Sequence, residues 1–207
     1  MQLIVPFFRQ PNGYTCMPSC LKMLLEYYGM RISFKDIMRG CRCTLEGTDF
    51  EAAAEFLASV MCRPILARFN PAIYPAWYRT ARRSDIFRGL MRRLPFTPEE
   101  HKHCHTALLG FLRQGGTWKV GVLSLRELKR LLQQKRPVIV SVEARLLWPT
   151  KKRDRIAPIP HAILVVGYTV DEILFLDPGY SRGEISRRNN NAFLAAWYFD
   201  GGATLCV

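Results

Sequence analysis

The chain contains one cysteine whose position favours a reactive thiolate. Cys16 follows the turn-forming residues 11–15 and begins a segment in which apolar residues recur at the three- and four-residue steps of a helix. The unpaired N–H groups at a helix N-terminus stabilise negative charge and therefore the thiolate. Cysteine is also among the residues most often buried in a core. The role of Cys16 thus depends on the groups that the fold brings beside it.

Three further residues could act with Cys16. His161 begins an apolar strand, where an imidazole without a partner would be costly, and Asp177 ends the next strand. If these strands are neighbours, Asp177 can hold one imidazole nitrogen while the other faces Cys16. Gln10, six residues before the cysteine, could donate its side-chain N–H to an oxyanion, together with the Cys16 backbone N–H. This set predicts nucleophilic acyl transfer with Cys16, His161, Asp177 and Gln10 as catalytic residues.

The other cysteines and histidines form weaker metal-binding patterns. Cys41 and Cys43 are one residue apart, closer than paired zinc ligands usually are, and no second pair follows them. Four candidate ligands lie within five residues: His101, His103, Cys104 and His105. Alternate residues diverge on a helix, so one ion could bind them all only on an extended stretch. We expect a solvated polar loop here and no metal or cofactor; a metal at this place would be structural.

The cysteine content and the apolar segments indicate the cell compartment in which the protein is expected. Seven cysteines are an odd number in a chain large enough to fold without disulfides, which favours a reducing compartment. No run approaches the ~18 apolar residues of a membrane span. The first ten residues lack the basic and apolar regions of a signal peptide. We therefore expect a soluble cytoplasmic protein that could reach another cell only by a signal-independent route.

The order of the elements predicts the fold class. Helices are expected over residues 16–28, 33–38 and 48–58, and another begins at Ser124. Strands are expected over 137–142, 161–168 and 173–177, before a last helix that carries Phe193 and Trp197. Helices come first and strands last, which indicates an α+β fold with N-terminal helices on a C-terminal antiparallel sheet. The 207 residues, 49% of them hydrophobic, suffice for one domain.

A basic segment interrupts this pattern at about residues 68–120. It holds ten Lys and Arg against three Asp and Glu, over half of the chain's net charge of +13, with aromatic residues and prolines between them. We expect an inserted, partly helical subdomain or lid. Basic and aromatic residues together can bind nucleic acid, but no nucleic-acid module is recognisable, so docking of an acidic protein substrate is favoured. A neutral lid or a contact with another copy stays open, as does the oligomeric state.

Seven pieces of the chain, in order, resemble the papain-like cysteine peptidases of the bacteriocin-processing type, which cleave after double-glycine leaders, and their stand-alone bacterial relatives. The pieces are Gln10-x5-Cys16, Leu21-x3-Leu25-x-Tyr27-Tyr28-Gly29, Glu46-Gly47-Thr48, Pro137-Val138-Ile139-Val140, His161 to Tyr168, Leu176-Asp177-Pro178-Gly179 and Phe193-x3-Trp197. They cover roughly residues 5–67 and 120–200, so the basic segment falls outside them. The resemblance implies a papain-like fold with Cys16 as nucleophile, His161 as general base and acid, Asp177 as its orienting partner and Gln10 in the oxyanion hole.

The chain departs from this family in two ways. Met17 stands where the family usually has a glycine after the nucleophile, which narrows access to the thiol or shifts the start of the helix. No transporter membrane domain accompanies the chain, so processing of a leader during export is not implied.

Three functions follow from the same residues. The first is a cysteine peptidase or isopeptidase that hydrolyses a peptide or protein amide through a thioester. The second is an acyltransferase or deamidase, in which an amine resolves the thioester or a glutamine is the substrate. The third is a non-catalytic basic binding module on the same fold. Retention of Cys16, His161 and Asp177 together argues against the third.

Overall fold

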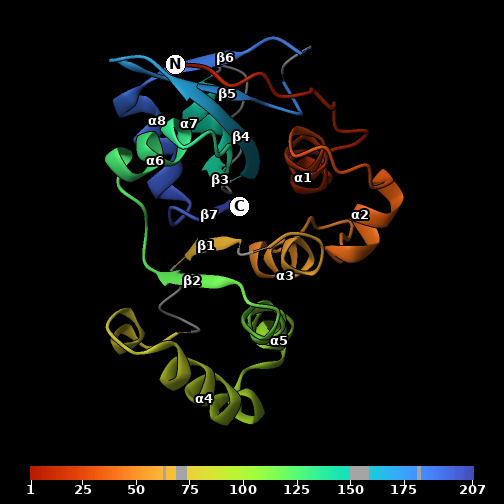
Figure 1. Ribbon diagram of the computed structural model, residues 1–207, viewed down its shortest axis with the longest axis vertical. Helices are drawn as coiled ribbons and strands as arrows, with labels where there is room; N and C mark the ends of the chain where they lie inside the picture. The colour runs from red at the N-terminus through yellow and green to blue at the C-terminus, as the bar shows by residue number, and fades with distance from the viewer. Residues whose placement is uncertain (63, 69–73, 150–158, 181–182) are drawn as a thin grey trace.

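The computed structural model describes residues 1–62, 64–68, 74–149, 159–180 and 183–207 (Figure 1). In these ranges the strands form one seven-stranded sheet with the order β2-β1-β7-β3-β4-β5-β6. Its strands are β1 (Ile65–Arg68), β2 (Thr117–Val120), β3 (Val138–Glu143), β4 (Pro160–Tyr168), β5 (Glu172–Leu176), β6 (Ser186–Asn189) and β7 (Thr204–Cys206). Neighbouring strands are antiparallel except for the parallel pair β1–β2.

Helices cover both faces of this sheet. They are α1 (Cys16–Tyr27), α2 (Phe34–Gly40), α3 (Phe50–Val60), α4 (Arg83–Arg93), α5 (Glu99–Arg113), α6 (Leu125–Gln133), α7 (Ala144–Leu147) and α8 (Asn190–Phe199). Two 3₁₀ turns flank α4, at Ala76–Arg79 and Leu94–Phe96. Figure 1 shows α1, α3 and α5 on one side of the strands and α6, α7 and α8 on the other. The expected α+β class is confirmed.

Helix α1 is held against the sheet by one continuous apolar face. Its buried side chains include Met17, Leu21, Leu24 and Leu25, spaced as a helix requires, and they pack against β4. Burial of each large apolar side chain contributes about 1.5–3 kcal/mol. Gly29, with a φ of +78°, follows the helix and turns the chain in a conformation that glycine adopts without strain. The first turn of α1 is therefore fixed beside the end of β4.

Strands β4 and β5 are antiparallel neighbours, as the sequence predicts. Leu164 pairs with Leu176, so the chain leaves β5 at Asp177 on the end of the sheet where His161 begins β4. A register shift between Val165 and Gly167 marks a β-bulge farther along β4. The sheet topology thus places the expected histidine and aspartate close together.

The basic segment joins the main structure. Strand β2 extends the sheet beside β1, and α5 packs along α3. The buried ring of Trp118, on β2, contacts the buried rings of Tyr74 and Tyr78. Residues 69–73, also within the expected segment, lie outside the described residues.

Two expectations for this part of the chain were wrong in detail. Strands β1 and β2 precede the expected C-terminal strands and pair with each other in parallel, so the sheet is mixed rather than wholly antiparallel. Each of the two strands has four residues, too few to display a periodic pattern. Residues 101–105 are not a polar loop but lie in α5, in which Cys104, His105, Leu108 and Leu112 are buried.

Candidate functional site

The site begins with Cys16, the first residue of α1, which is partly buried. Burial by itself would raise the pKa of this thiol. The hydrogen bond and the positive charge of His161, with backbone N–H groups of Ala162 and Met17, outweigh burial and lower the pKa below its ordinary value of 9.0. The geometry therefore favours a thiolate at Cys16.

His161, at the start of β4, faces both Cys16 and Asp177. Its Nε2 atom lies 2.7 Å from Oδ1 of Asp177, which leaves the other side of the ring to the cysteine. Burial disfavours the charged imidazolium, but hydrogen bonds and charges from Asp177 and Cys16 raise the pKa of His161 to about 10. Cys16 and His161 are thus arranged as a thiolate–imidazolium pair.

Asp177 is fully buried and anchored by several donors. Its Oδ1 accepts the backbone N–H groups of Gly179 at 2.8 Å and Tyr180 at 3.1 Å, besides the contact with His161. Its Oδ2 accepts the indole N–H of Trp148 at 2.8 Å. These bonds stabilise the carboxylate and fix the orientation of the histidine.

Trp148 and Tyr180 also belong to the site, but the sequence-based prediction does not include them. The two rings stack with centroids 5.6 Å apart, and Tyr180 presents an edge contact to His161 at 6.0 Å. The guanidinium of Arg188 lies 4.0 Å from the centroid of the Trp148 ring. Tyr180 stands three residues after Asp177 and could have been suspected from that spacing. Trp148 lies 29 residues before Asp177, and no local pattern connects them.

Gln10 lies beside the histidine. Its backbone N–H donates to the carbonyl of Pro178 at 3.0 Å, which ties the N-terminal segment to the turn after β5. A Cβ atom at Gly179 would lie 3.3 Å from both the Gln10 amide and Cε1 of His161, so only glycine fits here without displacement. The Gln10 Nε2 donates to the carbonyl of Asn12 at 2.9 Å, which uses one of its two N–H groups. The oxyanion-hole role of Gln10 stays a prediction.

A cleft of about 730 Å³ opens in front of Cys16 and His161. One wall comes from residues 42–50, between α2 and α3, and another from Ser141, Ala203 and Asp200 at the end of the sheet. Arg68 and His103, from the basic segment, also line it. Arg68, Ser141 and Asp200 are cleft residues that no sequence motif indicates.

The four residues considered as metal ligands do not form one set. His105 is buried, and its Nδ1 lies 2.8 Å from the hydroxyl of Thr97; burial lowers its pKa, which favours the neutral ring. His103 is exposed and pairs with Asp49, whereas Cys104 is buried. His101 does not join them in any cluster of potential ligands found among the described residues. Because successive side chains of α5 point in different directions around the helix, the four side chains do not meet at one point, as the sequence predicts.

The described part of the chain contains no helix that combines the length and the apolar character needed to cross a bilayer. Each of the seven cysteines is a free thiol, as the sequence predicts.

Comparison with known proteins connects this site to a family. The model of the Peptidase_C39 like family matches residues 96–204, and that of the Peptidase C39 family matches residues 4–61. The first match includes His161 and Asp177 and begins inside the basic segment, whereas the second includes Gln10 and Cys16. No curated protein matches the chain.

Solved structures share the fold at low sequence identity. A double-glycine motif protease from an AMS/PCAT transporter, in complex with the leader peptide, has a TM-score of 0.53 and 13% identity over 99% of this chain and 91% of its own. The peptidase domain of Streptococcus ComA, a bi-functional ABC transporter involved in a quorum sensing pathway, has a TM-score of 0.50 and 14% identity, covering 99% and 95%. A C39-like peptidase from Bacillus anthracis has the same score and identity, covering 100% and 96%. Because the model of the Peptidase_C39 like family matches more than half of the chain, the chain belongs to the C39-like peptidases, which are cysteine peptidases of the papain-like fold.

Proposed function

We propose that the protein hydrolyses a peptide or isopeptide bond through a thioester on Cys16. The observation that carries this proposal is the arrangement of Cys16 and His161 in the cleft with Asp177 behind the histidine, with the pKa of the thiol lowered and that of the imidazole raised. A nucleophile, a base and a group that orients the base are the requirements of this chemistry.

The reaction has two balanced steps. The Cys16 thiolate attacks the carbonyl carbon of the substrate; the C–N bond then breaks as the His161 imidazolium gives its proton to the leaving amine. In the second step His161 takes a proton from water, the resulting hydroxide adds to the thioester carbonyl, and the C–S bond breaks to restore the thiolate. The Cys16 backbone N–H and the free N–H of Gln10 would stabilise the oxyanion of each step.

Asp177 acts in this scheme through the histidine. A buried carboxylate that accepts four donors keeps its own orientation, and its bond to Nε2 leaves Nδ1 of His161 directed at the sulfur. It also stabilises the imidazolium that the pair with Cys16 requires.

The proposed substrate is an extended polypeptide, and the excess of basic residues favours an acidic one. A cleft of this size accepts several residues of a chain, and the similar transporter protease holds a leader peptide. Residues 68–120 would act as a basic insertion that adds Arg68 and His103 to the cleft wall and long-range attraction for acidic groups. Seven free thiols favour a cytoplasmic site of action.

The test combines labelling of Cys16 with a search for cleavage. Limiting iodoacetamide is added across pH 5 to 9, and peptide mapping compares Cys16 with the exposed thiol of Cys62 in the same molecule. We expect Cys16 to react first and to stay reactive at pH 5–6. Incubation of the protein with a mixed peptide library, with and without added amines, should yield new carboxyl termini from hydrolysis, and Cys16→Ala should yield none.

Two outcomes would contradict the proposal. Uniform, slow labelling of several cysteines would show that Cys16 is not activated. Products that carry the added amine in place of a free carboxylate would assign the protein to acyl transfer instead of hydrolysis.

A further inference from the structure

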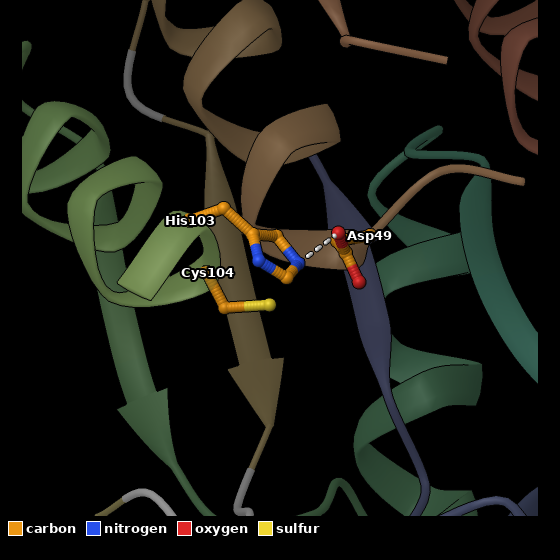
Figure 2. Close-up of side chains that lie close together, drawn as sticks. All are labelled: Asp49, His103 and Cys104. Atoms are coloured by element: carbon orange, nitrogen blue, oxygen red, sulfur yellow. Dashed lines mark ion pairs between the residues drawn. The ribbon is translucent and has the colours of Figure 1, made fainter. Parts of the chain in front are cut away.

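A second cluster of chemically reactive side chains lies where α3 meets α5. Asp49 stands directly before α3, and His103 and Cys104 are consecutive residues of α5. Figure 2 shows the imidazole and the thiol projecting from α5 toward the Asp49 carboxylate. Nε2 of His103 lies 2.9 Å from Oδ2 of Asp49, and one donor atom from each of the three residues lies within 4.8 Å of the others.

Two of the three side chains, those of Asp49 and His103, are exposed enough to turn toward the third. Asp49 is the N-cap residue of α3, yet its carboxylate makes no capping hydrogen bond to the helix. Coordination of a metal ion by this carboxylate would therefore break no helix cap. His103 and Asp49 are about half exposed, with 56% and 44% of their side-chain surfaces accessible. Cys104 is buried and supplies the fixed end of the cluster. The packing of α3 on α5 holds the two backbones in place.

The donor set selects the class of ion. Sulfur, imidazole nitrogen and carboxylate oxygen together suit Zn²⁺, whereas Ca²⁺ and Mg²⁺ take oxygen ligands. Metal–ligand bonds of about 2.0–2.3 Å in a tetrahedron put the donors roughly 3.4–3.6 Å apart. The His103–Asp49 pair would open by about 0.5 Å from its 2.9 Å, and donor separations of up to 4.8 Å would close by about 1.2 Å. Side-chain rotations of the two exposed residues are sufficient for both changes.

The local charges also favour a cation. Asp49 and Glu51 contribute two carboxylates near Cys104, against the single guanidinium of Arg68. Arg68 is paired with Glu51 at 2.6 Å, so these two charges compensate each other and the net negative charge beside Cys104 is that of Asp49. The carboxylate of Asp49 thus faces the histidine and the thiol without a bound lysine or arginine of its own among the described residues.

We propose that Asp49, His103 and Cys104 form a Zn²⁺ site whose fourth position is open to the cleft. As the S–Zn bond forms, the Cys104 thiol releases its proton to solvent. Asp49 and His103 line the same cleft as Cys16, so the remaining ligand, water or a substrate group, lies on the path of a bound polypeptide. Zinc would link α3 to the basic segment and regulate entry to the cleft.

The site uses only two of the four ligands that the sequence places in residues 101–105. Its third ligand, Asp49, is more than fifty residues away in the chain and is brought in by the packing of the two helices. This site goes beyond the proposed peptidase activity, and its test does not depend on that activity.

The experiment measures zinc binding in a Cys16→Ala background, which removes the Cys16–His161 pair as a competing ligand set. Isothermal titration with ZnCl₂ should give one ion per chain. Asp49→Asn and His103→Ala should each weaken binding at least roughly tenfold, since losing even an outer-shell partner costs about 10- to 100-fold. His101→Ala and Cys62→Ser are the matched controls and should bind as the background does. Addition of Co²⁺ should produce a thiolate-to-cobalt absorption band that Cys104→Ser abolishes.

Circular dichroism checks that each variant folds. If Cys104→Ser does not fold, the two exposed variants, Asp49→Asn and His103→Ala, still decide the question. Loss of zinc binding in both, with both controls unchanged, would support the site. Equal binding in all variants, or an equal loss in His101→Ala, would overturn it.

Discussion

At the scale of single residues, the proposed chemistry depends on the pairing of Cys16 with His161. Burial raises the pKa of the thiol and lowers that of the imidazole, which would make both groups neutral. Their mutual hydrogen bond and opposite charges reverse both shifts, and the buried Asp177 adds to the rise in the pKa of His161. Removal of one partner should therefore return the other toward the neutral form.

His161→Ala tests this dependence. Without the imidazolium, burial dominates and the pKa of Cys16 rises, so the thiolate fraction near pH 6 falls about tenfold for each unit of the rise. We expect alkylation of Cys16 to slow accordingly at pH 6 and to recover as the pH increases, while labelling of Cys62 stays the same. In the unaltered protein, activity should decline as the pH passes about 10, where His161 loses its proton. Alkylation kinetics indifferent to His161→Ala would refute the pairing.

Asp177→Asn tests the anchoring of the histidine. An asparagine can keep its oxygen at the position of Oδ1, where three donors converge, but its NH₂ group then faces the indole N–H of Trp148. Two N–H donors in contact lower the free energy of unfolding by about 1–3 kcal/mol. In addition, the imidazolium loses its counter-charge. We expect kcat/KM to fall by up to about 10⁴-fold without reaching zero, because the base itself is still present.

Trp148→Phe supplies the partner for a double-mutant cycle. It removes the indole N–H and retains an aromatic ring against Tyr180. Combined with Asp177→Asn, it should restore part of the lost stability because the donor–donor contact disappears; the two changes should be non-additive in unfolding by denaturant. Strict additivity would mean that the Trp148–Asp177 bond does not hold the carboxylate.

At the scale of elements, the packing of α5 on α3 decides whether the basic segment is a separate unit. Leu108 is fully buried on α5, so Leu108→Ala should lower the free energy of unfolding by about 2–5 kcal/mol. If α5 belongs to the common core, thermal unfolding should remain one transition at a lower Tm. Leu45→Ala, the same substitution at a side chain that is 81% exposed, is the control and should change little. Two separate transitions would indicate an independently folding insertion.

The elements differ in how far the sequence predicts them. The helix at Cys16, the strand that contains His161 and the strand that ends just before Asp177 carry apolar patterns, and they form within a residue of where they are expected. Strands β1, β2, β6 and β7 have three or four residues each, and β6 reads Ser-Arg-Arg-Asn; only pairing with neighbours makes them strands. The contact of Trp148 with Asp177 and that of Asp49 with His103 join distant segments, so they arise from tertiary packing and leave no local signal.

At the scale of the whole molecule, the net charge of +13 creates a field that attracts acidic chains. Part of it is concentrated on α4, where Arg92 and Arg93 are exposed. Figure 1 shows α4 at the end of the molecule opposite β6. An acidic substrate that docks on α4 would gain affinity without any change to the chemistry at Cys16.

The double variant Arg92→Gln/Arg93→Gln tests whether α4 is a docking surface. Because α4 does not line the cleft, we expect KM for an acidic peptide to rise about 2- to 10-fold at low salt, with kcat unchanged. The effect should nearly vanish at about 1 M salt, where the Debye length is roughly 3 Å. Arg126→Gln/Arg130→Gln removes the same charge from exposed positions on α6 and serves as the control. A similar rise in KM in both variants would attribute the attraction to net charge alone and would exclude a specific role for α4.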